Sequence, residues 1–193
     1  MASEVQLCNL ALAKVGDEQI TSLTENSKAA RLCNLVYEPM RDATLRAHPW
    51  NFAIKRLELA ANTVTPAYEY NSQFTLPADF LRLLGTNMLD TAKFTVEGDQ
   101  LLCNVSALKI KYIYAVTDPN VFDRLFNEAL SARIAAELSI AMTDNRSLTV
   151  DLFNLFSTKL SDARTADATE GTPDDITADT WLNSRIAFTG LEA

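Results

Sequence analysis

The sequence predicts an α+β fold that is mainly α: a bundle of about four helices with a strand-rich insertion between the second and third helices. Apolar residues recur every three to four positions near both ends of the chain, whereas the middle alternates apolar and polar residues. Between these patterns lies Pro49, which must end a long helix because the residue before a proline disfavours helical geometry. We assign 1–49 and 118–170 to the bundle, 50–117 to the insertion and 171–193 to an extended C-terminal arm.

The first two helices have clear start and stop signals. Ser3 and Gln6 fit a capping box, and Gly16 is expected to end the first helix. Asn26 or Ser27 is expected to cap the second helix. Its predicted buried stripe consists of Ala29, Cys33, Val36, Met40 and Ala43.

Two further helices are predicted after the insertion. Asp118 is expected to cap the third helix, with Pro119 at its first position, and the fourth is expected to begin near Ser147. The third helix is apolar over a wide arc, so we expect it to be central in the bundle. One apolar ridge of the third helix consists of Phe122, Leu125, Ala129, Ala132 and Ala136, and the other of Phe126, Leu130 and Ile134. The fourth helix is expected to bury Leu152, Phe156, Leu160 and Ala163.

Residues 50–117 carry the strand patterns. Alternation through Tyr68, Tyr70, Phe74 and Leu76 predicts a half-buried strand, followed by a turn over 76–81 that leads into an apolar run. Gly98 and Asp99 predict the turn of a hairpin between 94–96 and 101–103. The clearest strand pattern is Ile110, Tyr112 and Tyr114 alternating with Lys109 and Lys111.

The composition indicates a soluble globular protein of one or two domains. The chain has 193 residues, of which 48% are hydrophobic and 22% charged. Its three cysteines, Cys8, Cys33 and Cys103, show no CxxC spacing and fall at apolar positions, so we expect buried thiols and neither a disulfide nor a zinc site. No apolar run approaches the roughly 20 residues that span a bilayer. We therefore expect a cytosolic protein without membrane contact.

The net charge of −8 is unevenly placed, because residues 118–193 hold thirteen acidic and six basic residues. Affinity for duplex DNA normally comes from clustered Lys and Arg, which release counterions from the phosphates. This distribution argues against a conventional nucleic-acid binder.

The sequence shows no recognisable catalytic set, and we predict no catalytic residue, cofactor or metal. His48 is the only histidine, and its place beside Pro49 and Trp50 favours a packed corner. The five glycines are isolated, so no phosphate-binding loop is expected.

A glycan or peptidoglycan hydrolase remains the alternative, because such an enzyme needs only two carboxylates about 5 to 10 Å apart. Asp79 and the pair Asp174 and Asp175 are candidates, although a turn former and solvated linker charges explain them more simply. The aromatic residues Trp50, Phe52, Tyr68, Tyr70 and Phe74 could line a sugar or peptide groove, but their pattern favours the buried face of a sheet.

The C-terminal segment is predicted to bind a partner. Residues 167–179 hold five acids, no base, and the helix breakers Gly171 and Pro173, which indicates an extended linker. The residues that follow carry more apolar surface than a solvated terminus tolerates. We expect them to dock onto another subunit or a partner protein; the alternative is that they fold back on their own bundle. The predicted partner-binding residues are Trp181, Leu182, Ile186, Phe188 and Leu191.

Several short motifs together resemble the tail tubular protein A family of short-tailed phages. They are Val15-Gly16-Asp17, Ile20-Thr21-Ser22-Leu23, Ala29-Ala30-Arg31-Leu32 and His48-Pro49-Trp50-Asn51-Phe52. The resemblance covers roughly residues 3–170. It continues through Leu76-Pro77, Asp79-Phe80-Leu81-Arg82-Leu83, Val96-Glu97-Gly98, Ile110-Lys111-Tyr112 and Ala135-Ala136-Glu137-Leu138.

The resemblance implies a head-to-tail adaptor, also called a gatekeeper or connector, that forms a dodecameric ring between the portal protein and the tail nozzle protein. It implies that the insertion faces tail components, with a tail fibre as a further candidate partner, and that the C-terminal extension reaches the portal. DNA would pass through the ring without specific binding. Such a protein is made in the host cytoplasm and resides in the virion tail at the head-to-tail junction. A cellular helical interaction module is a third possibility.

Overall fold

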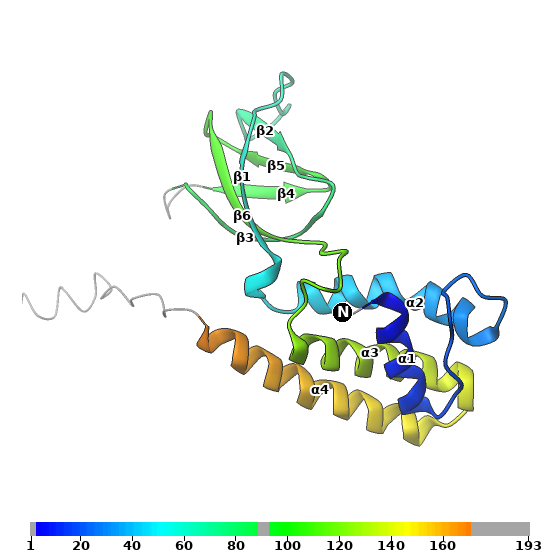
Figure 1. Cartoon of the computed structure of the whole chain (residues 1–193). Coiled ribbons are helices and arrows are strands. Elements are labelled where there is room, and N and C mark those ends of the chain that lie inside the picture. The colour runs from blue at the N-terminus through cyan, green and yellow to red at the C-terminus, as the bar shows by residue number, and fades with distance from the viewer. Residues whose placement is uncertain (1–2, 89–92, 171–193) are drawn as a thin grey trace, which may run out of the picture.

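The computed structural model describes residues 3–88 and 93–170, and it confirms the predicted fold class (Figure 1). Four helices form a bundle, and two small antiparallel sheets are inserted between the second and third helices. The central helix is α3, as predicted, because it packs against each of the other three. The helices are α1 Glu4–Val15, α2 Lys28–Arg46, α3 Arg124–Thr143 and α4 Arg146–Thr169.

The inserted sheets have three strands each, in the orders β1-β6-β3 and β2-β5-β4. A short 3-10 helix, Asn51–Ala53, leads from the bundle into the first strand. Between the sheets lies a separate apolar core that includes Phe74, Leu101 and Ile110. The strands are β1 Ile54–Leu59, β2 Ser72–Thr75, β3 Phe80–Thr86, β4 Phe94–Glu97, β5 Gln100–Cys103 and β6 Leu108–Tyr114.

The predicted signals at the ends of the first two helices are confirmed. Ser3 Oγ accepts the N–H of Gln6 at 3.1 Å, and Ser27 Oγ accepts the N–H of Ala30 at 3.1 Å. Gly16 ends α1 in a left-handed conformation with φ 85°, which a residue without a Cβ adopts at little cost.

The predicted start of the third helix is wrong by several residues. The N-cap of α3 is Asp123, whose carboxylate accepts the N–H groups of Leu125 and Phe126 at 2.8 and 3.3 Å. Asp118 instead accepts the N–H of Asn120 at 2.9 Å in a turn before the helix. Either aspartate could cap a helix. The turn that begins at Asp118 places Phe122 in the core, and α3 begins only after this turn.

The predicted stripe of the second helix is only partly right. Ala29 and Cys33 are buried, but Ala43 is exposed and the buried row continues through Tyr37 and Arg41. Arg41 is only 4% exposed, and its charge is balanced by Asp42 at 2.8 Å and Glu38 at 3.5 Å. A hydrophobicity pattern misses such residues because it counts their charged tips and not their apolar stems.

The strand predicted through Tyr68 and Tyr70 is also wrong at its start. Only Ser72–Thr75 forms a strand, because its partner β5 is four residues long and offers nothing for the preceding residues to pair with. Tyr68 is 84% exposed, and Glu69 turns the chain with φ 68°. The hairpin at Gly98 and the turn before Phe80 are confirmed.

The alternation of β6 is confirmed, and its single break has a structural cause. Ile110 and Tyr112 face the core between the two sheets, whereas Ile113 belongs to the core of the bundle. The end of β6 therefore contributes to both cores. All three cysteines are buried and free, as predicted, and a hydrogen bond to Cys33 together with burial raises the pKa of the Cys8 thiol.

The fourth helix begins where predicted, with its N-cap at Asn145. Leu152 and Ala163 are buried, and Leu160 packs at the edge of the core. The guanidinium of Arg133 lies 5.5 Å from the ring centroid of Phe156, the remaining residue of the predicted face.

Candidate interface at the corner between bundle and insertion

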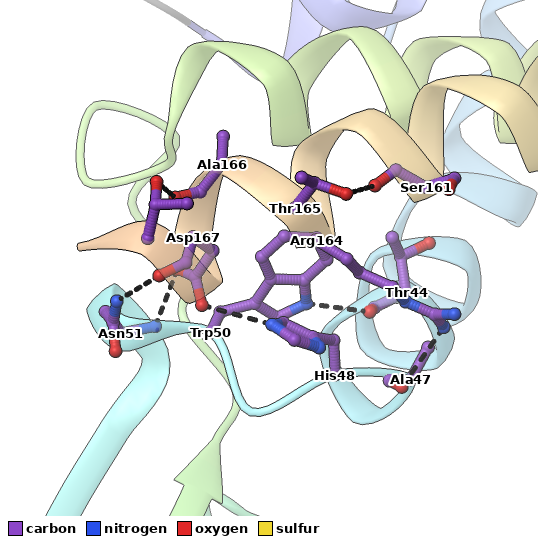
Figure 2. Close-up of polar contacts among 11 residues, drawn as sticks. Thr44, Ala47, His48, Trp50, Asn51, Ser161, Arg164, Thr165, Ala166 and Asp167 are labelled. Atoms are coloured by element: carbon purple, nitrogen blue, oxygen red, sulfur yellow. Dashed lines mark hydrogen bonds and ion pairs between the residues drawn. The ribbon is translucent and has the colours of Figure 1, made fainter. Parts of the chain in front are cut away.

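The corner, residues 47–52, connects α2 to β1 and is anchored by Trp50 (Figure 2). This side chain is fully buried, and its indole N–H donates to the carbonyl of Thr44 at 3.1 Å. Its ring meets Phe126 edge to face with 5.1 Å between centroids, and Phe52 lies 5.2 Å from the same ring of Phe126. An aromatic cluster thus fixes the corner against the start of α3.

Asp167 ties the last turn of α4 to this corner. Its Oδ1 accepts the backbone N–H of Asn51 at 3.0 Å, and its Oδ2 lies 3.1 Å from Nε2 of His48. The Asn51 side chain donates to the Asp167 carbonyl at 2.9 Å, and the Arg164 guanidinium donates to the carbonyl of Ala47 at 3.2 Å. Figure 2 shows these contacts converging from α4 and the corner.

The position of Asp167 is electrostatically unfavourable within its own helix. A carboxylate near a helix C-terminus lies among carbonyls that carry partial negative charge. The corner offsets this by supplying a backbone donor and the His48 ring. His48 therefore has a packing role here, as predicted, and its ring also meets Trp50 edge to face at 4.7 Å.

A second polar cluster surrounds Asp79, one of the predicted candidate acids. Lys55 Nζ lies 2.6 Å from Oδ2 of Asp79, and the Tyr112 hydroxyl donates to Oδ1 at 3.1 Å. The Asp79 carbonyl also accepts the N–H of Ala115 at 2.8 Å. Burial raises the pKa of the Tyr112 phenol to about 12, and the charge of Asp79 acts in the same direction. The contacts of Asp79 join the turn before β3 to β1 and β6.

The predicted groove aromatics do not come together. Trp50 and Phe52 belong to the core of the bundle, whereas Phe74 belongs to the core between the sheets. Tyr68 is exposed, and Tyr70 donates to or accepts from Thr95 at 2.8 Å between their hydroxyls. The expectation of a buried sheet face is thus right for Phe74 only.

The predicted partner-binding residues, Trp181, Leu182, Ile186, Phe188 and Leu191, lie outside the described residues, as do Asp174 and Asp175. Since Glu170 ends the described chain three residues after Asp167, the C-terminal segment begins close to the corner.

Sequence reasoning missed a basic hollow on the first sheet. Arg56, Lys109 and Lys111 line it with a single acid, Glu58, and it has a volume of about 530 Å³. Arg56 and Lys111 are direct partners in the register of β1 and β6. The signal is invisible before the register is known, because the cations come from strands about fifty residues apart in the chain.

A second missed feature is a groove of about 540 Å³ between the outer strands of the two sheets. It is lined by Phe80 to Leu83 of β3, Phe94 and Val96 of β4, and Arg46 at the end of α2. Within residues 3–88 and 93–170, no three His, Cys, Asp or Glu side chains gather as a metal site. None of the four described helices is long and apolar enough to cross a membrane.

The fold and these surfaces define a class of small α+β protein: a four-helix bundle carrying an inserted pair of three-stranded sheets. Comparison with protein-family models gives no match, and comparison with curated protein sequences gives none either.

Proposed function

We propose that this protein is a structural head-to-tail adaptor that forms a dodecameric ring between a phage portal and the tail nozzle and surrounds part of the DNA ejection channel. The observation that carries the proposal is the contact between Asp167 and the corner. Because of it, α4 ends beside the boundary between bundle and insertion, where the chain beyond Glu170 begins. This is the arrangement that an adaptor needs if one part of it meets the tail and its C-terminal extension meets the portal.

The order of the elements supports the same function. The family that the sequence resembles is expected to have a helical bundle interrupted by a strand-rich insertion, and this chain has that order. The second supporting feature is charge. A ring of subunits that each carry −8 has a strongly negative field, which disfavours binding of the passing duplex. Ring closure would multiply weak contacts between subunits, so the free subunit is expected to remain a monomer until a portal presents all its sites.

Electron microscopy tests the proposal directly. The full-length protein is mixed with portal rings of the same virus, and added rings are expected at one end of the portal. A variant with Trp181→Ala and Phe188→Ala is expected to lose this binding while its circular dichroism is unchanged. Asp151→Asn, an exposed change on α4, is the matched control. Bare portals at every protein concentration would contradict the adaptor function.

The hydrolase alternative predicts a different result. Purified capsule or peptidoglycan would release sugar, and Asp79→Asn would abolish the release. We expect no release, since the Asp79 carboxylate is held by Lys55 and Tyr112 at the joint of three strand ends.

A further inference from the structure

The groove between β3 and β4 has two open strand edges. β3 is the last strand of one sheet and β4 the last strand of the other, so within the described residues each pairs with a strand on one side only. Figure 1 shows the two strands neighbouring each other in the insertion, and both contribute side chains to the same groove. Unpaired strand edges are templates for an added extended segment.

The walls of the groove are apolar and poorly covered. Phe94 and Val96 alternate along β4 and therefore lie on one face of it, and they are 43% and 41% exposed. An exposed apolar edge strand promotes aggregation unless something covers it. The exposure of these two residues therefore favours a covering segment.

The bundle side of the groove is positively charged. Arg46 and Arg82 both line it, and each guanidinium donates to a main-chain carbonyl: Arg46 to Leu81, and Arg82 to Arg46 at 2.9 Å. Neither forms an ion pair with a carboxylate of residues 3–88 or 93–170. The groove thus combines an apolar wall with two cations that have no acidic partner among residues 3–88 and 93–170.

The C-terminal segment has the complementary order of residues and begins nearby. Arg164 holds Ala47, the neighbour of Arg46, so α4 ends close to the bundle side of the groove. The chain then carries acids at 174, 175 and 179, and Trp181 and Leu182 follow after Thr180. At about 3.3 Å per extended residue, positions 171–181 can span roughly 35 Å, which is ample for a segment that stays on its own subunit.

We propose that residues 174–182 of the same chain occupy this groove in the free subunit. The acidic positions lie beside Arg46 and Arg82, and Trp181 and Leu182 cover Phe94 and Val96. Attachment through α4 favours the chain's own segment over that of a second copy, because a short linker gives it a high effective concentration. The proposal rests on the groove and on the order of acidic and then apolar residues in the segment. It holds whether or not the protein binds a portal.

Fluorescence of the full-length monomer tests this inference. The chain has two tryptophans, and Trp50 is buried, so the difference between the wild type and Trp181→Phe reports on Trp181. We expect blue-shifted emission from Trp181 and protection from acrylamide. Val96→Asp is expected to shift this emission to the red and remove the protection. Val150→Asp, at a 59% exposed apolar position on α4, is expected to change neither property.

A charge exchange separates docking from indirect effects on folding. Arg82→Glu is expected to expose Trp181, and adding Asp174→Arg and Asp175→Arg is expected to restore its protection. Circular dichroism checks that every variant is folded. The inference is overturned if Trp181 is fully accessible in the wild type or unaffected by Val96→Asp. Protection that disappears on dilution would also overturn it, since the occupant would then be a second copy.

Discussion

The carboxylate of Asp167 accepts the backbone N–H of Asn51 at 3.0 Å, although the two residues are 116 positions apart in the chain. This bond closes the last helix onto the corner that separates bundle from insertion. It adds a polar contact to the apolar packing of Ala53 and Ile113, which also joins the insertion to the bundle. The end of α4 and the corner at 47–52 each form from residues close together in the chain. The bond from Asn51 to Asp167 joins these two structures.

Removing the Asp167 carboxylate is expected to destabilise the fold. Asp167→Ala leaves the Asn51 N–H and the His48 ring without their acceptor, and the loss should be about 2 kcal/mol in the free energy of unfolding. Urea denaturation at neutral pH measures it. Asp151→Ala, an exposed aspartate on the same helix, is the control and should change the free energy by less than about 0.5 kcal/mol. Equal effects of the two changes would show that the corner contact contributes nothing.

The position of the helix cap can be tested by comparing two aspartates. Asp123→Ala should cost about 1 kcal/mol, because two N–H groups of the first turn of α3 lose their acceptor. Asp118→Ala should cost less, since the bonds that its carboxylate accepts come from Asn120 within a surface turn. Thermal unfolding of both variants gives the comparison. A larger loss for Asp118→Ala would place the functional cap where the sequence pattern predicted it.

Stability should fall at alkaline pH partly because of Tyr112. Its pKa is raised from 10.0 to about 12, so the folded state holds this proton more tightly than the unfolded state does. The resulting stabilisation is complete below pH 10 and is lost as the pH rises toward 12. In Tyr112→Phe, the decrease in unfolding free energy between pH 9 and pH 11 should therefore be smaller than in the wild type. An identical decrease in both proteins would contradict the role of this phenol.

The basic hollow predicts a stabilising substitution. Arg56 and Lys111 are directly opposite in the register, and like charges at such positions repel each other. Lys111→Glu should raise the free energy of unfolding by about 0.5 kcal/mol at low salt and by less at high salt. Lys109→Glu is the matched control and should lower the free energy of unfolding, because the residue opposite Lys109 is Glu58. A salt-independent effect would exclude charge as the cause.

Much of the fold was predictable because it follows from local patterns. The caps at Ser3 and Ser27, the left-handed Gly16, the hairpin at Gly98 and the alternation in β6 each depend on residues within a few positions. The wrong predictions depend on pairing that periodicity does not record. Residues at 68–71 had a strand pattern but no strand to pair with, and Arg41 is buried because Asp42 and Glu38 balance its charge.

The candidate surfaces were predictable to a smaller extent. The acidic, then apolar, C-terminal segment is visible in the sequence, and it remains the predicted partner-binding site. The groove that we propose as its binding site is not visible in the sequence, because Arg46, Arg82 and Val96 come from three different elements. Nothing in the pattern around Asp167 distinguishes it from a solvated linker acid either.

The sequence by itself determined which segments are helices, where most of the strands lie and where most of these elements end, because periodicity and capping act over a few residues. Only the tertiary structure decided which aspartate caps α3, which acid ties α4 to the corner and which strand edges stay open. These outcomes depend on the register of the strands and on contacts between residues far apart in the chain. A linear pattern contains the residues for such contacts but not their pairing.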